Sequence, residues 1–200
     1  KVIWSKRKTD WDDRLDLDGG PFPIADTERH TKYEAETLEI QLSGSTDNME
    51  YVLGYYTLED DAYTANPQTY FAGAPFLQNY SGTSDAEAFF GQITLSISEK
   101  LDLTLGARKT EEDKTGFKEY VGLFSQVGQG SFDDTSGTFI VSYDYSNNTN
   151  LYFKLADGFK AGGINAEAPT PFESLKPYNP ETIESTEFGL KGRYFDNRMM

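Results

Sequence analysis

The sequence predicts an all-β protein: an antiparallel, up-and-down transmembrane β-barrel, of which this chain supplies a fragment of about seven or eight strands. Three observations lead to this prediction. Apolar and polar residues alternate over most of the chain, which is typical of strands with two different faces. Short and long connections alternate between these segments. Aromatic residues gather beside the short connections.

The alternating segments follow one another along the chain, and the apolar residues of each lie two positions apart, on one face of a strand. They are Leu38, Ile40 and Leu42; Phe89, Ile93, Leu95 and Ile97; Leu101, Leu103, Leu105 and Ala107; Phe139, Val141, Tyr143 and Tyr145; Leu151, Phe153 and Leu155; and Phe188, Leu190 and Tyr194. Residues 49–58 are apolar on both faces, and their aromatic content favours a strand. The opposite faces carry polar residues such as Asp102, Arg108 and Lys154. Alternation alone leaves open whether they line a lumen or meet solvent.

The connections differ in length in a regular way. Short turns are predicted at residues 44–48, 99–100, 146–149 and 196–197, and long Gly-, Pro- and Asp-rich loops at 16–31, 60–86, 115–135 and 161–181. One end of the sheet would therefore carry tight turns and the other end long loops. A transmembrane barrel has this arrangement, with strands that need about 9–11 residues to cross the bilayer. A soluble sandwich gives no reason for it.

Aromatic side chains flank two of the predicted turns: Tyr143, Tyr145, Tyr152 and Phe153 at one, Tyr194 and Phe195 at the other. An interfacial aromatic girdle of a membrane barrel would lie in these positions. Cross-strand aromatic pairs in a soluble sheet would give the same pattern. The aromatic residues therefore favour the barrel only together with the alternating connections.

Composition excludes several classes of function. Acidic residues exceed basic residues by 33 to 18, and the formal net charge of −15 argues against a nucleic-acid partner. The absence of cysteine excludes disulfides, thiolate metal sites and cysteine nucleophiles. The single histidine, His30, argues against a Ser–His catalytic triad. We expect no enzyme activity, no cofactor and no metal. Both ends interrupt a pattern, so we also expect the chain to be a piece of a longer protein.

The stretch GFKAGGIN, residues 158–165, is the most enzyme-like motif of the chain. A P-loop needs Ser or Thr directly after its lysine, and a dinucleotide fingerprint needs Gly-x-Gly-x-x-Gly leading into a helix. Here Lys160 precedes the glycine pair, and prolines follow where a helix should begin. We therefore predict that Gly162 and Gly163 allow positive φ angles where a strand leaves the sheet. The acidic stretches 16–20 and 111–113 are interpreted as a turn and a solvated charge run.

The last quarter of the chain resembles the β-barrel of TonB-dependent outer-membrane receptors. In that family a strand ends in Gly-Phe-Lys-x-Gly-Gly-hydrophobic-Asn, and after a loop Pro-Glu-Thr opens a strand with Glu-x-Gly-x-Lys and an Asp-Asn-Arg turn. The matching residues are Gly158, Phe159, Lys160, Gly162, Gly163, Ile164, Asn165, Pro180, Glu181, Thr182, Glu187, Gly189, Lys191, Phe195, Asp196, Asn197 and Arg198. Residues 37–44, 51–61 and 88–114 also resemble family strands, so the resemblance covers about residues 37–200.

The resemblance implies a large barrel that holds an N-terminal plug and imports a scarce ligand, in the first place an iron–siderophore complex. Residues 1–200 would be part of that barrel, without the plug and the TonB-contacting motif. The implied partners are outer-membrane lipid, the plug of the same chain, the TonB energising complex and a small-molecule ligand such as a siderophore. The implied location is the bacterial outer membrane. The matched residues are expected to be architectural: strand-to-loop glycines, lumen-facing charges and turn residues.

Ligand contacts in such receptors come mostly from outer loops and the plug. The candidates are the aromatic residues of the longest predicted loop: Tyr63, Tyr70, Phe71, Phe76 and Tyr80. Their rings could stack on a planar or apolar ligand, and packing within the loop itself is the alternative.

Two other functions remain as alternatives: a soluble antiparallel β-sandwich binding module, for example for carbohydrate, and last a β-rich hydrolase that uses loop carboxylates. The barrel and the sandwich differ in what covers the apolar faces. In a sandwich, the faces that carry Ile93, Leu105 and Phe139 would pack against a second sheet. In a barrel, they would form an uncovered apolar band on the convex side of one curved sheet.

Overall fold

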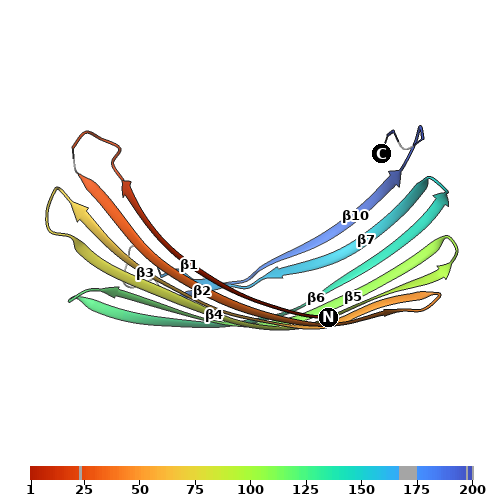
Figure 1. The fold of residues 1–200 in the computed structure, drawn as a ribbon, viewed down its shortest axis with the longest axis horizontal. Coiled ribbons are helices and arrows are strands. Elements are labelled where there is room, and N and C mark those ends of the chain that lie inside the picture. The colour runs from red at the N-terminus through yellow and green to blue at the C-terminus, as the bar shows by residue number, and fades with distance from the viewer. Residues whose placement is uncertain (23, 167–174, 197, 200) are drawn as a thin grey trace.

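The computed structural model describes residues 1–22, 24–166, 175–196 and 198–199. Eight antiparallel strands form one curved sheet in the order β1-β2-β3-β4-β5-β6-β7-β10 (Figure 1). The strands are β1 Val2–Asp16, β2 Ala25–Ser45, β3 Met49–Tyr70, β4 Phe76–Ser98, β5 Leu101–Tyr120, β6 Phe124–Ser146, β7 Thr149–Lys160 and β10 Glu181–Gly192. A hairpin of two short strands, β8 Gly163–Ile164 and β9 Pro177–Tyr178, lies between β7 and β10. The predicted up-and-down order and number of strands are confirmed.

The strands are longer than predicted, and two predicted loops are wrong. Strands β2 to β6 have between 20 and 23 residues. Most of residues 60–86 and 115–135 is strand, and the connections there shrink to residues 71–75 and 121–123. The turns at the other end, residues 46–48, 99–100 and 147–148, are short as predicted. Among the described residues there is no helix long and apolar enough to cross a membrane.

Pro67 shows how a strand tolerates a residue that sequence reasoning assigns to a loop. Proline has no N–H to donate to a neighbouring strand, and the pairing of β3 with β2 is interrupted at Asn66 and Pro67. The side-chain amide of Asn66 donates instead to the backbone oxygen of Glu28, at 2.6 Å. A side chain thus takes over the hydrogen bond that the proline cannot make.

Strand register joins the apolar residues into one continuous band. Leu105 of β5 stands opposite Ile93 of β4 and Phe139 of β6, and Phe139 stands opposite Leu155 of β7. The band is uncovered: Phe89 is 64% exposed, Leu105 and Leu155 are 42% exposed, and Ile93 and Phe139 are half-buried. In the described part of the chain no second sheet packs on this face. The barrel prediction is therefore confirmed over the sandwich alternative.

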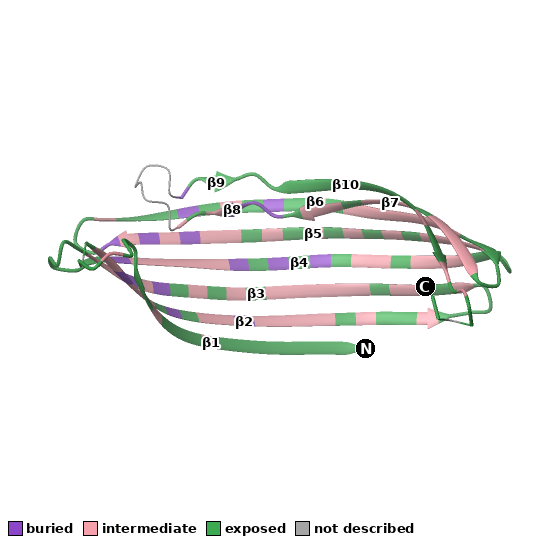
Figure 2. Ribbon diagram, turned by 90° about the horizontal axis from the view of Figure 1, so that it is seen from above, coloured by how far each residue is buried: buried purple, intermediate pink, exposed green. Residues whose placement is uncertain are grey.

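The opposite, polar face is the inner, concave face of the sheet. The hairpin β8–β9 lies on this face, against Gly116 of β5. Along β5, residues that share the face of Gly116, such as Thr110 and Glu112, are less exposed than their neighbours Glu111 and Asp113. Figure 2 shows that the buried residues gather toward the end of the sheet where β8 and β9 lie. The polar side chains predicted for this face, including Arg108, therefore line the inner surface.

The predicted aromatic girdle divides between the two faces. Tyr143 and Phe153 belong to the outer apolar rows, opposite Leu151 and Val141 respectively. Tyr152 lies on the inner face, because it stands opposite Ser142.

Candidate ligand-binding site

Neutral polar side chains form a hydrogen-bonded cluster on the inner face, toward the end of the sheet away from the short turns. Asn66 Oδ1 accepts from Gln78 Nε2 at 2.6 Å and from Gln68 Nε2 at 3.0 Å, while Asn66 Nδ2 donates to Thr27 Oγ1 at 2.6 Å. Asn66, Gln78 and Thr27 are all buried. Because each amide has a partner, the cluster presents a fixed pattern of donors and acceptors. We call Thr27, Asn66, Gln68 and Gln78 the amide cluster.

Three aromatic rings follow one another across neighbouring strands beside the amide cluster. The ring centroids of Phe76 on β4 and Tyr120 on β5 are 4.9 Å apart, and those of Tyr120 and Phe124 on β6 are 4.8 Å apart. Both pairs are tilted, an arrangement that aromatic rings favour. The ammonium group of Lys118 lies 5.0 Å from the ring centroid of Tyr120. We call Phe76, Tyr120 and Phe124 the aromatic ladder.

The structure separates the five predicted ligand contacts. Phe76 belongs to the aromatic ladder, and Tyr70 donates its hydroxyl to Gln68 of the amide cluster at 2.8 Å. Tyr80 is also on the inner face, opposite Thr64 of β3. Phe71 is in the β3–β4 turn, 80% exposed and with φ of 52°. Tyr63 points to the outer face, because it alternates with Thr64 along β3.

Sequence reasoning missed Tyr120 and Phe124 because they were placed inside a predicted loop. They stand opposite each other across the three-residue connection 121–123. The available signal was the spacing: the two rings flank a glycine-containing turn, as the predicted girdle residues flank theirs.

The glycine pair in GFKAGGIN has a different role from the predicted one. Neither Gly162 nor Gly163 has a positive φ, and the described glycines that do are Gly19 and Gly122. The pair is instead required by close packing. A Cβ at Gly163 would stand 2.6 Å from the Tyr178 ring, and a Cβ at Gly162 would overlap the backbone oxygen of Tyr178. The prediction was wrong because close approach and positive φ both select glycine.

The other family-motif residues have architectural contacts. Lys160 Nζ pairs with Glu181 Oε1 at 3.1 Å, across the end of the β7–β10 pair, and both side chains are exposed. Phe159 stands opposite Thr182, and Gly158 stands opposite Ile183. Of the others, Pro180 directly precedes β10 and Asn165 directly follows β8, while Asn197 lies outside the described residues.

Tyr152 of β7 gathers three of the motif residues on the inner face. Its hydroxyl donates to Glu187, and the ammonium of Lys191 lies 4.9 Å from its ring centroid. The ring covers Gly189, which stands directly opposite on β10. Glu187 and Lys191 therefore face inward, as the resemblance implied.

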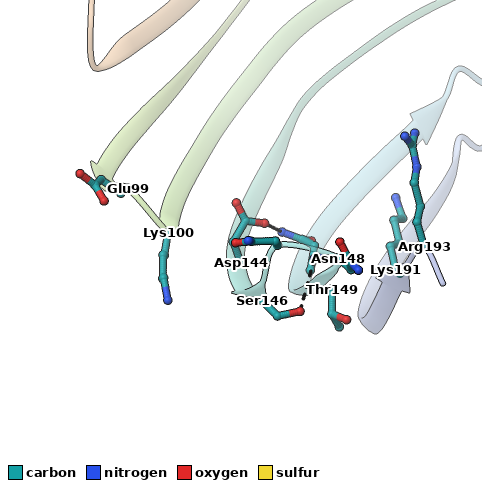
Figure 3. A pocket seen from close by; sticks show the side chains of 11 residues that line it. Glu99, Lys100, Asp144, Ser146, Asn148, Thr149, Lys191 and Arg193 are labelled. Atoms are coloured by element: carbon teal, nitrogen blue, oxygen red, sulfur yellow. Dashed lines mark hydrogen bonds between the residues drawn. The ribbon is translucent and has the colours of Figure 1, made fainter. Parts of the chain in front are cut away.

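A hollow lies at the short-turn end of the sheet (Figure 3). It has a volume of about 670 Å³ and charged lining residues of both signs, which include Glu99, Lys100, Asp144, Lys191 and Arg193. Asn150 Nδ2 donates to Asp144 Oδ1 at 2.9 Å. Within the described residues no three acidic or histidine side chains gather in a way that could hold a metal ion. The mixed charges suit a contact with another polar surface better than a metal or a single charged ligand.

Comparison with known families identifies the barrel. The family model described as TonB dependent receptor-like, beta-barrel, matches residues 3–200. The chain belongs to this family. No curated protein matches the sequence significantly.

Two solved structures resemble this TonB-dependent receptor barrel. The ferric yersiniabactin uptake receptor FyuA from Yersinia pestis gives a TM-score of 0.84 at 16% identity, over 96% of this chain and 30% of that receptor. The siderophore receptor PiuA from Acinetobacter baumannii gives 0.61 at 14% identity, over 98% of this chain and 35% of its own. At such low identity the likeness shows the fold. The chain spans about a third of the length of these two receptors.

Proposed function

We propose that this chain is the barrel segment of an outer-membrane receptor that imports an iron–siderophore complex with energy passed through TonB. The observation that carries the proposal is the aromatic ladder beside the amide cluster, on the inner face of a TonB-dependent receptor barrel. The names of FyuA and PiuA support a siderophore as the cargo class.

The orientation follows from the connections 17–24, 71–75 and 161–180, which are longer than every turn at the opposite end, although the connection 121–123 is as short as the turn 46–48. Outer-membrane barrels turn their short connections to the periplasm and their longer ones outward. The short turns 46–48, 99–100 and 147–148 therefore face the periplasm. The aromatic ladder is at the other end, at the outer mouth. The apolar band faces lipid, and the polar inner face below the ladder is available to the plug.

The two groups of side chains suit a metal chelate. Aromatic faces can stack on the planar rings of a chelate, and the more accessible Gln68 and Tyr70 can bond to its polar edges. The role that we propose for this site is therefore binding and passage of a ligand.

The test is binding and uptake of radiolabelled ferric complexes by the full-length receptor in iron-starved cells. The probes are ferric yersiniabactin, a ferric catecholate and a ferric hydroxamate. Tyr120→Leu in the aromatic ladder should raise the Kd of the accepted probe roughly 10-fold, because one stacked ring contributes about 0.5–1.5 kcal/mol beyond its buried area.

Tyr63→Leu is the matched control, since Tyr63 is on the outer face of the same end of the sheet. It should leave binding unchanged. Uptake of none of the three probes by the wild-type receptor would overturn the siderophore proposal. Equal losses of affinity in Tyr120→Leu and Tyr63→Leu would overturn the ladder as the contact surface.

A further inference from the structure

Part of the connection between β7 and β10 lies against the inner wall of the barrel. We call its described residues, 161–166 and 175–180, the inner hairpin. Its short strands contact β5 and β6. A Cβ at Gly116 of β5 would stand 2.7 Å from Ile164 Cγ2, and a Cβ at Gly128 of β6 would stand 2.8 Å from Leu175 Cβ. The wall therefore lacks side chains at two of the places where the inner hairpin rests, while Phe132 of β6 packs beside Gly162.

We call the wall surface at Gly116 and Gly128 the glycine seat. Strand register aligns its glycines. Gly116 stands opposite Gly82 of β4 on one side and opposite Gly128 on the other. Glycine inside a strand weakens a sheet, because it packs no side chain and loses the most backbone entropy. A row of three such residues is unfavourable for the sheet alone. Close approach of the hairpin explains two of them, because the Ile164 side chain lies over Gly116 and the Leu175 backbone lies over Gly128.

The contact is closed to solvent on both sides. Leu175 is 4% exposed, and Lys118, which lies beside the seat on β5, is 0% exposed. If the inner hairpin left the wall, apolar side chains and bare glycine backbone would both meet water. Within residues 1–22, 24–166, 175–196 and 198–199, no other segment reaches this row of glycines to replace it.

We propose that the inner hairpin is a fixed ledge inside the barrel, which stays on its glycine seat during ligand binding and transport. Gly116 is four residues from Tyr120 of the aromatic ladder and on the same face of β5, so the ledge lies below this part of the mouth. The inference rests on the proposed transport function.

A disulfide between the wall and the hairpin tests the ledge. Residues 1–200 contain no cysteine, and the Cβ positions of residues 116 and 164 lie 3.3 Å apart. That is close to the separation of about 3.5–4.5 Å in natural disulfides. The variant is Gly116→Cys/Ile164→Cys in the full-length receptor, with any cysteine elsewhere replaced by serine. The single variants are the controls.

We expect the crosslink to form on oxidation of intact cells, and we expect equal uptake of the radiolabelled ferric probes in the oxidised and reduced states. Uptake that is lost on oxidation and regained on reduction, with binding kept, would show that the hairpin must leave the wall. A folded double variant that does not crosslink would show that the hairpin is not seated.

A second pair of variants reports on the seat without any ligand. Leu175→Cys alone should resist a bulky maleimide added to cells, because Leu175 is 4% exposed. Combined with Gly128→Leu it should react, because the leucine side chain displaces the hairpin. Combined with Gly106→Leu it should stay protected, since a Cβ at Gly106 meets no atom within 3.6 Å. Reaction of Leu175→Cys alone would overturn the ledge. If the wild-type receptor takes up no ferric probe, the proposed function fails, while crosslinking and maleimide protection still decide the seat.

Discussion

The ring of Tyr152 lies across Gly189 of the neighbouring strand and fills the space that a side chain there would occupy. Gly54 and Phe90 are related in the same way on β3 and β4, because a Cβ at Gly54 would overlap the Phe90 ring. An aromatic ring that covers an opposite glycine shields its backbone and fixes the register of the two strands.

Gly189→Ala should therefore destabilise the receptor, because the new Cβ forces the Tyr152 ring away from its contacts with Glu187 and Lys191. The expected cost is about 1–3 kcal/mol, as for other overpacked sites. Urea-induced unfolding of the full-length receptor in lipid vesicles measures it. Gly106→Ala is the control, since there is room for its methyl group. Equal stability of the two variants would contradict the covering role of Tyr152.

A charged side chain in the apolar band should lower the free energy of unfolding, whereas the same charge on the inner face should leave it nearly unchanged. Leu105→Lys places an ammonium in the middle of the lipid-facing rows, and we expect a loss of about 2–4 kcal/mol. Gln92→Lys, one strand away on the inner face, should change the free energy of unfolding little. The measurement is unfolding from vesicles, as above. A larger loss for Gln92→Lys would mean that the two faces had been assigned the wrong way round.

The hydrogen bond from Asn66 Nδ2 to the backbone oxygen of Glu28 should stabilise the β2–β3 pair, because Pro67 has no N–H to donate there. Asn66→Ala leaves the Glu28 oxygen and the Gln78 amide short of partners, at a cost of about 1–3 kcal/mol for a buried unsatisfied group. Pro67→Ala restores an N–H that can reach Glu28. In a double-mutant cycle, the loss from Asn66→Ala should be smaller when residue 67 is alanine. Strict additivity of the two changes would refute this compensation.

The connection between β1 and β2 should loosen in acid. Hydrogen bonds from the backbone N–H groups of Ala25, Gly20 and Ile24 hold the pKa of Asp18 below its ordinary value of 3.8. Because the pKa is lowered in the folded state, the ionised carboxylate stabilises the turn at pH values above 3.8. This contribution is lost as the pH falls through the pKa of the folded state. Hydrogen exchange at the amides of Gly20 and Ala25 should therefore gain a pH dependence below 3.8, beyond the intrinsic one. Asp18→Asn should abolish it.

The sequence alone predicted the apolar band and the order of the strands. Apolar and polar side chains alternate clearly in a strand wherever one of its faces meets lipid. Leu105 and Phe139 needed no structure to be placed on one face. Residues 60–86 could not be predicted as strand, because both faces are polar there and Pro67 normally signals a loop. Their pairing depends on neighbouring strands far along the chain, which local patterns do not show.

The candidate site was predictable only in part for the same reason. A search of residues 60–86 for aromatic side chains selected Phe76 and Tyr70, which lie on the inner face. The same search selected Tyr63, which points outward. Only the register decides between the two faces. The seat formed by Gly116 and Gly128 gave no signal at all, because a glycine that makes room for a distant hairpin looks like any glycine in a loop.

The length of the strands sets where capture takes place. A strand of 23 residues such as β4 is about 76 Å long at roughly 3.3 Å per residue. With a tilt of about 35–45° it rises some 54–62 Å, of which the lipid-facing band takes only about 25 Å. In the receptor that we propose, the wall therefore extends well above the membrane. A ligand would meet its mouth before it reached the depth of the lipid.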